Sequence, residues 1–439
     1  MEFKALFLGK YPEHWGLMSI DELKAGSKNS IAMGPFGSRI KKENFIDSGV
    51  PVIRGNNLKK FEFNEEEFVF LSEEKANELK ASQVFRGDIV ITHRGTLGQV
   101  GYIPSNSKYE KYIVSQSGLK ITLNNEVINS KYVYYYLNSN IGQHQLLMNK
   151  SQVGVPAIAQ ASTSIKKIMV PIPPLFEQEK IVRILDLISM KNENNNSIIN
   201  KLEDILSCLF KQWFIDFEFP NEQGLPYRST GGEIAESELG KIPKGWQVGS
   251  IGDICILKNE KVNLDKSEET FNYIGLEHMP QGSIALNDWE SSEKVSGTKA
   301  VFNRGDLLFG KLRPYFKKVG IAATNGVCST DILVMLPKNL YEYSFLISHL
   351  TQDKFIEYTT STATGTRMPR SGWNQISNYA IVIPPVELLE NYNEKILPML
   401  QMIQELVHEN NSLKSLRNYL LPKLLSGEIE IPEESVVEL

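Results

Sequence analysis

Apolar residues recur at alternating spacings of three and four along two stretches of the chain, and this pattern dominates the sequence. Such a heptad ladder predicts a long helix with one apolar seam that packs against a second helix of the same kind. The first ladder is interrupted only at Lys191 and Asn195, and the second extends from Leu389 to Leu424. The side chains predicted to pair the helices are Ile181, Ile184, Ile188, Asn195, Ile198, Leu202, Ile205 and Leu209 in the first ladder, and Ile396, Met399, Ile403, Leu406, Asn410, Leu413 and Leu420 in the second.

Each ladder suits a helix of about 35 residues, which spans about 50 Å. We expect the two helices to pair antiparallel and to separate two globular domains. Asn195 and Asn410 fall at equivalent seam positions, as expected if a buried Asn pair fixes the register at a cost in stability. The alternative is that each Asn marks a local break or loop. Pro398 lies inside the second ladder and should kink that helix or shift its start.

The ladders are parts of a larger internal repeat. The segments that recur in the same order are "LGKYPEHW" (8–15) and "LGKIPKGW" (239–246), "RGDIV" (86–90) and "RGDLL" (304–308), "IMVPIPPLFE" (168–177) and "AIVIPPVE" (380–387), and "NNS" (195–197) and "NNS" (410–412). One match could be coincidence, but four collinear matches indicate a tandem duplication. Because the period exceeds about 200 residues, the repeated unit is a whole module and not the short repeat of a solenoid.

Each module opens with about 150 residues in which short β-rich runs mix with helical runs and with Gly, Pro and Asn turns. A Pro pair then fixes an extended connector, and helix can begin only beyond it. We therefore predict an α+β fold with two globular α/β domains in tandem pseudo-twofold repeat, separated by two long helices that form an antiparallel coiled coil. The predicted bounds are 1–165 (first domain), 166–220 (connector and helix), 221–376 (second domain), 377–426 (connector and helix) and 427–439 (acidic tail).

The composition is that of an ordinary globular protein, with 41% hydrophobic and 23% charged residues among 439. No apolar run reaches the length of a membrane span, and the N-terminus lacks the apolar core of a signal peptide. Cys208, Cys255 and Cys328 lie far apart, so we expect small buried hydrophobes in a reducing cytoplasm. The net charge of −5 argues mildly against wholesale binding to a polyanion, but the acidic residues gather in a few segments and local distribution decides.

The motifs of common catalytic sites are incomplete in this sequence. In "GDLLFGKL", which has the glycine and lysine spacing of a phosphate-binding loop, Leu312 stands where a hydroxyl must reach Mg²⁺. "IPPL" and "IPPV" lack the polar and aromatic residues that flank the Pro pair of an adenine methyltransferase. The six histidines are scattered, so neither a metal site nor a nucleophile–base pair is indicated. We therefore expect this chain to catalyse nothing alone.

Basic, amide and aromatic side chains gather instead in loops that correspond between the modules. Arg and Asn bond bidentately to guanine and adenine edges, and a Gly-Pro-Phe-Gly turn lets the backbone approach a phosphate. A solvated loop charge is the alternative for any one of these residues. The candidate DNA-binding residues are Arg39, Lys41, Lys42, Arg54, Asn56, Asn57, His93, Arg94, Gln99, Ser115 and Gln116 in the first module, and Lys311, Arg313, Tyr315, Lys317, Lys318, Arg367, Arg370, Trp373 and Asn374 in the second.

Taken together, these motifs resemble the specificity (S) subunit of type I restriction–modification systems. The segments that carry the resemblance are the "LGxIPxxW" opening, "GPFGS", "IRGNNL", "GDIVITHRGTLGQVG", the "PIPPLxEQ" connector and the C-terminal "LLPKLLSGEI". The resemblance covers nearly the whole chain, in the order target-recognition domain, spacer helix, target-recognition domain, spacer helix. In the second module "GPFGS" has no evident counterpart and "IGLEHM" replaces "IRGNNL", so the contact residues are less well identified there.

The resemblance implies a DNA-binding protein without catalytic activity, in which each domain reads one half of a split, asymmetric site in double-stranded DNA. It implies that the paired helices set the gap and dock two methyltransferase (M) subunits, which carry S-adenosylmethionine and methylate adenine N6. Restriction (R) subunits, with ATP and Mg²⁺, would add translocation and cleavage. No cofactor or metal ion is then expected in this chain, and a bacterial or archaeal cytoplasmic protein is implied.

Two other functions stay open from the sequence. One is an orphan DNA-binding protein of the same fold that acts without the nuclease, and the other is an unrelated tandem module that binds protein or carbohydrate. Copurification with a methyltransferase chain distinguishes the S subunit from the other two. Steeply salt-dependent DNA binding distinguishes both DNA-binding functions from the unrelated module.

Overall fold

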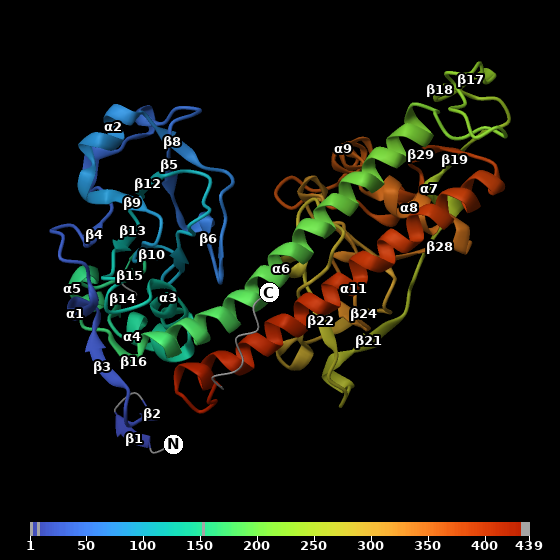
Figure 1. Cartoon of the computed structure of the whole chain (residues 1–439). Coiled ribbons are helices and arrows are strands. Elements are labelled where there is room, and N and C mark those ends of the chain that lie inside the picture. The colour runs from blue at the N-terminus through green and yellow to red at the C-terminus, as the bar shows by residue number, and fades with distance from the viewer. Residues whose placement is uncertain (1–2, 7–8, 152–153, 432–439) are drawn as a thin grey trace. The chain divides into compact units, whose positions relative to one another are not determined.

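The computed structural model describes residues 3–6, 9–151 and 154–431 (Figure 1). The chain divides into two compact units, of which unit 1 comprises 1–191 and 415–439 and unit 2 comprises 192–414. Helix α6 (Leu175–Phe210) and helix α11 (Val386–Leu425) both pass through this division. Each unit therefore holds one globular domain and a part of each helix, and the predicted domain bounds stay predictions. Leu8 and residues 432–439 of the predicted acidic tail lie outside the described residues.

The domain of unit 1 is built on two four-stranded sheets. One has the strand order β11-β10-β13-β4 and is antiparallel, and the other has the order β8-β5-β12-β9 with β5 and β12 parallel. The strands are β4 (Ile31–Met33), β5 (Val50–Ile53), β8 (Val69–Leu71), β9 (Gln83–Phe85), β10 (Ile89–Thr92), β11 (Val100–Tyr102), β12 (Lys111–Val114) and β13 (Gly118–Ile121). The helices are α1 (Ile20–Leu23), α2 (Glu73–Glu78), α3 (Ser130–Asn138), α4 (Asn140–Leu147) and α5 (Ala161–Lys166). Short antiparallel pairs complete it: β1 (Phe3–Leu6) with β2 (Gly9–Pro12), β3 (Gly16–Ser19) with β16 (Met169–Ile172), β6 (Leu58–Lys59) with β7 (Glu62–Phe63), and β14 (Lys150–Ser151) with β15 (Ala157–Ile158).

The domain of unit 2 repeats the two main sheets of unit 1 strand for strand, but its described strands include no counterpart of the pairs β6–β7 and β14–β15. Its sheets have the orders β26-β25-β28-β20 and β23-β22-β27-β24-β21, again with one parallel pair, β22 and β27. Only the edge strand β21 has no counterpart among the described strands of unit 1. The strands are β20 (Cys255–Leu257), β21 (Lys261–Asn263), β22 (Asn272–Ile274), β23 (Glu290–Ser291), β24 (Thr298–Phe302), β25 (Leu307–Gly310), β26 (Val319–Ile321), β27 (Gly326–Cys328) and β28 (Ile332–Pro337). The remaining elements are β17 (Ile234–Ser237), β18 (Gly240–Pro243), β19 (Gln247–Ser250), β29 (Ala380–Ile383), α7 (Ile251–Ile254), α8 (Tyr343–Leu350), α9 (Asp353–Ser361) and α10 (Trp373–Ser377). The predicted fold class, a tandem repeat of α/β domains with long helices, is confirmed.

The repeated "RGD" segment forms the same turn in both domains. Gly87 and Gly305 have positive φ angles of 89° and 92°, a region that favours glycine. The carboxylates of Asp88 and Asp306 accept a hydrogen bond from the backbone N–H three residues earlier, at 2.9 and 2.8 Å. The motif recurs because the turn before β10 and β25 needs a glycine with positive φ and an aspartate that accepts the backbone hydrogen bond.

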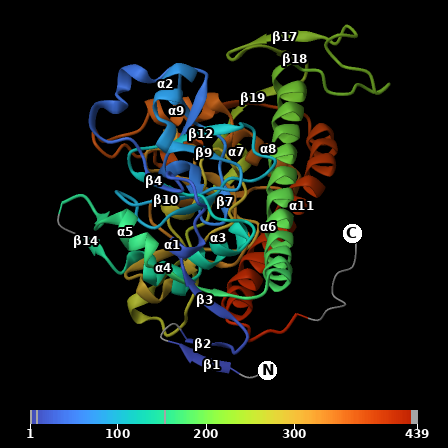
Figure 2. The same ribbon diagram turned by 60° about the vertical axis from the view of Figure 1, so that its left-hand side comes forward.

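The two long helices pair antiparallel, as predicted. In unit 2 the Asn195 side chain donates from Nδ2 to Oδ1 of Asn410 at 3.0 Å, and Asn410 donates to Asn196 at 2.9 Å. Trp213, just beyond the α-helical part of α6, lies 5.4 Å from Tyr392 between ring centroids. Figures 1 and 2 both show the helices side by side in this part of the chain. Both Asn residues lie within continuous helix, so the alternative that they mark breaks is wrong.

Helix α11 is longer than the sequence indicates, with 40 residues against 36 in α6. It begins at Val386, so the prediction that Pro398 could shift its start is wrong. Pro398 is exposed, where the unpaired carbonyl that a proline leaves one turn earlier can bond to water.

Of the predicted helix-pairing residues, Ile181, Ile188, Asn195, Ile396, Ile403 and Asn410 are buried, whereas most of the others are less buried than the residue that follows them. Asn195 is fully buried in α6, but Ile205 is 43% exposed and the neighbouring Leu206 is buried instead. Likewise Ile199 is more deeply buried than Ile198. In α11 the buried residues are Leu400, Val407 and Leu421 where Met399, Leu406 and Leu420 were predicted.

This shift has a simple physical cause. Two heptad frames share every seventh position and differ by one residue in between, and adjacent apolar pairs such as Ile198 with Ile199 satisfy both frames. The half-buried members, among them Leu202 and Leu406, pack against the domain core beside the seam. Packing of the domain against the helix therefore selects the frame.

A segment of each domain is anchored to a long helix by a polar side chain. In unit 1 the guanidinium carbon of Arg417 in α11 lies 3.9 Å from the ring centroid of Phe61, and burial lowers the pKa of Arg417. In unit 2 the carboxylate of Glu203 in α6 accepts hydrogen bonds from the Ser283 hydroxyl (2.7 Å) and the Ile284 N–H (2.8 Å). Burial raises the pKa of Glu203, which costs stability that these two bonds offset.

The buried tryptophans explain why the same opening segment occurs in both modules. Trp15 is 2% exposed and packs under the segment that follows α11, where a β-carbon at Gly427 would lie 3.3 Å from the indole. Trp246 packs under the segment that follows α6, 5.2 Å from Phe219 between ring centroids. Each tryptophan therefore seals the end of a long helix against its domain. The segments after the two helices, "IDFEFP" and "GEIEIP", are a further pair of repeats that the four collinear matches did not include.

The cysteine expectation is correct for two residues and wrong for one. Cys255 and Cys328 are buried, whereas Cys208 is exposed because it lies on the outer face of α6. Among the described residues, no helix has the length and apolarity needed to cross a bilayer.

The Asn pair gives a direct test of the helix register. Replacing Asn195 by Ala removes a buried partner of Asn410, so we expect the free energy of unfolding to fall by about 1–3 kcal/mol in urea titrations. Asn194→Ala, at an exposed position one residue earlier, is the control and should leave the unfolding midpoint unchanged. Equal midpoints for the two variants would contradict a stabilising Asn pair.

Candidate nucleic-acid interface

The loops that follow four strands of unit 1 converge at one edge of its domain. Ser115, directly after β12, donates its N–H to the Ile53 oxygen at the end of β5 (2.9 Å), and His93, directly after β10, donates to Ser117 (2.9 Å). A β-carbon at Gly34, directly after β4, would lie 1.9 Å from the Ser115 oxygen, so only glycine fits there. The tertiary structure thus brings together the candidate segments that the sequence scatters over about eighty residues.

The candidate residues of unit 1 differ in their access to a ligand. Arg39, Lys41, Lys42, Asn56, Arg94 and Gln116 are exposed, Arg54, Gln99 and Ser115 are half-buried, and His93 and Asn57 are buried. Lys41 forms an ion pair with Glu43 at 3.4 Å, which at such exposure contributes little to stability. The exposed group carries four cationic side chains, which suit contacts to phosphate oxygens.

Arg54 and Gln99 hold polar atoms that the described residues do not satisfy. One Nη of Arg54 donates to the Glu67 oxygen at 2.8 Å, but its Nε has no partner among the described residues. Oε1 of Gln99 is equally without a partner and would lie 2.9 Å from a β-carbon at Gly55. Sequestered polar atoms without partners are rare because they cost free energy, and here two of them border the same turn.

Asn57 has a structural role and does not face a ligand. It is fully buried, its Oδ1 accepts from the Arg54 N–H at 2.9 Å, and its Nδ2 donates to the backbone oxygens of Asn64 and Glu66. Because these bonds occupy its donors and an acceptor, the Asn57 side chain is not available for the DNA contact that the sequence predicted. Its amide instead shapes the turn that carries Arg54 and Asn56.

The His93 side chain is also too deeply buried for direct contact with a ligand. It is 5% exposed, and burial lowers its pKa, so the imidazole is neutral at neutral pH. Its backbone joins two loops, since its oxygen accepts from Ile158 at 2.9 Å. A charged contact from His93 to a phosphate is therefore not supported by its position.

Three backbone hydrogen bonds, here called the loop frame, occur at equivalent places in both units. They are Ser115 to Ile53, Ile158 to His93 and Gly95 to Pro156 in unit 1 (each 2.9 Å), and Ser329 to Ile274 (3.0 Å), Ser371 to Lys311 (3.0 Å) and Arg313 to Pro369 (2.7 Å) in unit 2. The side chains on this frame differ, because Lys311 replaces His93, Leu312 replaces Arg94 and Arg313 replaces Gly95. The backbone is thus kept while the chemistry that it presents changes.

Several basic candidates of unit 2 already have partners. Arg370 forms two hydrogen bonds to Asp331 (2.8 and 3.3 Å), which raise its pKa. Lys317 pairs with Asp353, and Lys318 donates to the Leu276 backbone oxygen. These side chains order the loops of unit 2, so a ligand must compete for them.

Among the remaining candidates of unit 2, some are accessible to a ligand and others pack against the domain core. Lys311 and Arg313 are half-buried, and Tyr315 and Arg367 are exposed. Trp373 and Asn374 lie in α10, where Trp373 packs partly against the core. Arg313, with φ of 51°, places its backbone in a strained left-handed conformation that the frame bond to Pro369 holds.

The fold also assembles a cluster that residue spacing does not reveal. Single ligand atoms of Glu277, His278 and Glu290 lie within 4.8 Å of one another. However, Nδ1 of His278 accepts a hydrogen bond from the Gly275 N–H at 2.9 Å, so the proton of the neutral ring resides on Nε2. With that turn intact neither ring nitrogen offers a lone pair to a metal ion.

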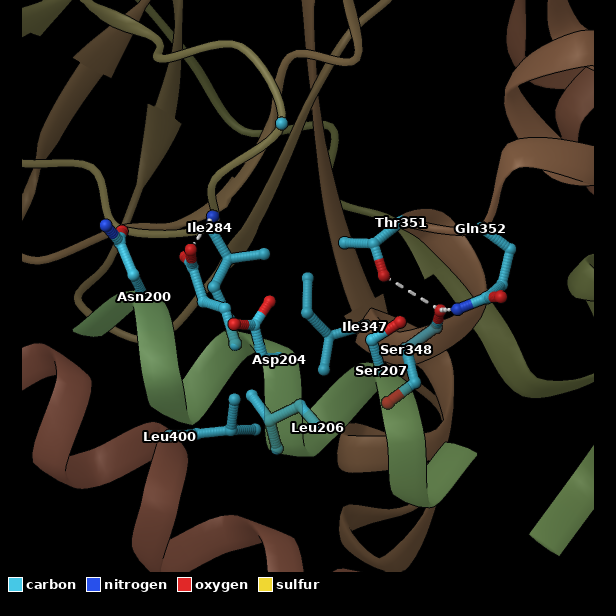
Figure 3. Close-up of a pocket in the computed structure, with 12 residues that line it drawn as sticks. Asn200, Asp204, Leu206, Ser207, Ile284, Ile347, Ser348, Thr351, Gln352 and Leu400 are labelled. Atoms are coloured by element: carbon cyan, nitrogen blue, oxygen red, sulfur yellow. Dashed lines mark hydrogen bonds between the residues drawn. The ribbon is translucent and has the colours of Figure 1, made fainter. Parts of the chain in front are cut away.

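A cavity of about 450 Å³ lies in unit 2 away from these loops. Asn200, Asp204 and Ser207 of α6 line one wall, and Ser348, Thr351 and Gln352 of the α8 region line another (Figure 3). Thr351 and Gln352 bond to the Ser348 backbone oxygen at 2.9 and 3.0 Å. The cavity adjoins Glu203, so it belongs to the contact between domain and helix and not to the candidate interface.

Comparison with known proteins identifies the repeated unit. The family model of the type I restriction modification DNA specificity domain matches the chain twice, at residues 33–204 and 243–415. The type I restriction enzyme MjaIX specificity subunit of Methanocaldococcus jannaschii is 26% identical, over 98% of this chain and 97% of that protein. The EcoDI specificity subunit of Escherichia coli is 23% identical, over 69% of this chain and 71% of that protein. A crystal structure of the type I S subunit from M. genitalium has the same fold, with a TM-score of 0.54 at 15% identity over 94% of this chain and 96% of that one.

The contrast between Asn57 and Asn56 tests the assignment of structural and exposed roles. We expect Asn57→Ala to lower the free energy of unfolding by about 1–3 kcal/mol, because it removes a buried amide that bonds to three backbone groups of this turn. Asn56→Ala, at the exposed neighbouring position, should stay within about 0.5 kcal/mol of the parent protein. Urea unfolding measures both, and a larger loss for Asn56→Ala would reverse the assignment.

Proposed function

The chain belongs to the family of type I restriction–modification DNA specificity subunits, and from that premise we propose that each domain reads one half of a bipartite, asymmetric site in double-stranded DNA. The observation that carries the proposal is the loop frame, which is common to both domains and presents different side chains in each. Two readers that dock alike on a duplex but select different bases require such an arrangement.

The exposed cations suit the task of positioning. Arg39, Lys41 and Lys42 follow the Gly-Pro-Phe-Gly turn and have side chains long enough to reach phosphates on either side of a groove. Arg54, Asn56 and Gln99 border one turn and carry the groups that bond to base edges. Under the proposal, the first set supplies affinity for any duplex and the second supplies choice of sequence.

We further propose that the paired helices set the gap between half-sites and dock the two M subunits. Both helices pass without interruption from one unit to the other, as a spacer must. S-adenosylmethionine would reside on the M subunits, and ATP and Mg²⁺ on the R subunits that join them. This chain would then be a non-catalytic subunit that acts on DNA in the cytoplasm. The orphan DNA-binding protein of the same fold is the second candidate, and absence of a copurifying methyltransferase would favour it.

Charge removal tests the positioning role. We expect Arg39→Ala, Lys41→Ala and Lys42→Ala, combined, to weaken binding to all duplexes and to lower the slope of log affinity against log salt by about 2–3. Lys201→Ala, Lys241→Ala and Lys395→Ala, which remove the same charge at exposed positions outside these loops, form the control. Fluorescence anisotropy at several salt concentrations measures both. Relaxed choice at a single base pair, without a change in slope, would contradict the assignment.

Helix length tests the spacer role. One heptad inserted after Lys191 and one after Lys414 lengthen both helices at the division between the units and leave the contacts within each unit intact. We expect the gap between half-sites to grow by about three base pairs, since seven residues add about 10 Å, while the half-sites stay the same. Methylation-site sequencing in a host that expresses the variant with its M partner gives both quantities. An unaltered gap would refute the spacer role.

A further inference from the structure

The turns that follow the parallel strands β5 and β22 have the same geometry in both units. A single turn of 3₁₀ helix spans Gly55–Asn57 in unit 1 and Leu276–His278 in unit 2. The residue before it is extended in each case, with φ and ψ of −121° and 173° at Arg54 and of −93° and 173° at Gly275. The "IGLEHM" segment is therefore the structural counterpart of "IRGNNL", although the two share little sequence.

Each turn is pinned from within by its third residue. Oδ1 of Asn57 accepts from the Arg54 N–H, and Nδ1 of His278 accepts from the Gly275 N–H, both at 2.9 Å. The residue after the turn is buried in both units, since Leu58 is 1% exposed and Met279 is 2% exposed. The backbone between these fixed points is held on both sides.

Only the middle residue of each turn is presented to the outside. Asn56 and Glu277 are exposed, and neither side chain forms a hydrogen bond among the described residues. They stand beside the loop frame, on a backbone that the bonds of Asn57 and His278 hold in place. Rigid presentation lowers the entropy cost of a specific hydrogen bond.

We propose that this position is a base-reading position in both domains, and that Asn56 selects adenine while Glu277 selects cytosine. The carboxamide of Asn offers a donor and an acceptor that match adenine N7 and N6, whereas a carboxylate only accepts and suits the cytosine N4 amine. The inference rests on the proposed function, because it assigns one base of each half-site to one residue.

The neighbouring residues differ in a way that fits this exchange. The space that a β-carbon at Gly275 would occupy lies 2.2 Å from a carboxylate oxygen of Glu277, so glycine leaves room for the acid over the turn. In unit 1 the same place belongs to Arg54, whose guanidinium donates to the Glu67 backbone oxygen. The residue before the turn thus differs between the units, glycine in unit 2 and arginine in unit 1.

Reciprocal substitution tests the proposal in the full chain bound to its M subunits. The complex selects sites from a randomised duplex library, and the enriched sequences are read for the parent, Asn56→Glu and Glu277→Asn. We expect Asn56→Glu to lose adenine and gain cytosine at one position of the first half-site, with a change in preference of about ten- to a hundredfold. Glu277→Asn should make the opposite change in the second half-site. In each variant the other half-site and the gap stay the same.

Glu290→Gln and Glu277→Gln complete the design. Glu290 is exposed beside Glu277, so Glu290→Gln removes the same charge and should leave the selected sequence unchanged. Glu277→Gln should weaken the cytosine preference at one position. If it instead strengthens binding to all sequences equally, Glu277 merely repels phosphates and the inference is overturned. A parent complex that selects no bipartite site would overturn the proposed function itself, whereas a parent site that Asn56→Glu leaves unaltered would overturn only this inference.

Discussion

The pairing of α6 with α11 is the interaction on which the rest of the protein depends. In unit 2, Ile199, Leu206 and Ile403 of the two helices belong to the same buried cluster as the strands of the domain. In unit 1, Ile181 and Leu421 do the same. Each domain completes its hydrophobic core on both helices, so a part of each helix belongs to each domain. The buried Asn195–Asn410 bond restricts the register, because a slip of one heptad would set each amide against apolar side chains and leave it without a partner.

The polar anchors tie the segments after the turns at Gly55–Asn57 and Leu276–His278 to the long helices. The turn at Gly55–Asn57 runs directly into the hairpin whose Phe61 lies under Arg417 of α11. The turn at Leu276–His278 runs into the segment whose Ser283 binds Glu203 of α6. In both units the ionisable group is desolvated, which opposes its charged form, and its partner offsets that cost. Each turn is therefore held close to a long helix of its own unit.

Duplication with divergence is visible at the level of single atoms. The loop frame keeps its backbone bonds in both domains, while His93, Arg94 and Gly95 become Lys311, Leu312 and Arg313. In the second domain, several of the candidate basic side chains form ion pairs or hydrogen bonds within the domain, as Arg370 does with Asp331. Under the proposed function, the shared backbone would preserve how a domain docks, and the different side chains would give each copy its own target.

The sequence alone determined the tandem repeat, the two long helices, their antiparallel pairing and the location of the candidate loops, because these depend on periodicity and on collinear motifs that local chemistry enforces. It left two matters to the tertiary structure. The first is the helix frame, since adjacent apolar residues such as Ile205 and Leu206 satisfy either frame until a domain packs against one of them. The second is the role of single polar residues. Asn56 and Asn57 are chemically identical neighbours, yet one is exposed and the other is buried with its hydrogen bonds made. Only the surrounding fold decides which of two such amides meets solvent, because burial is a property of contacts between residues far apart in the chain.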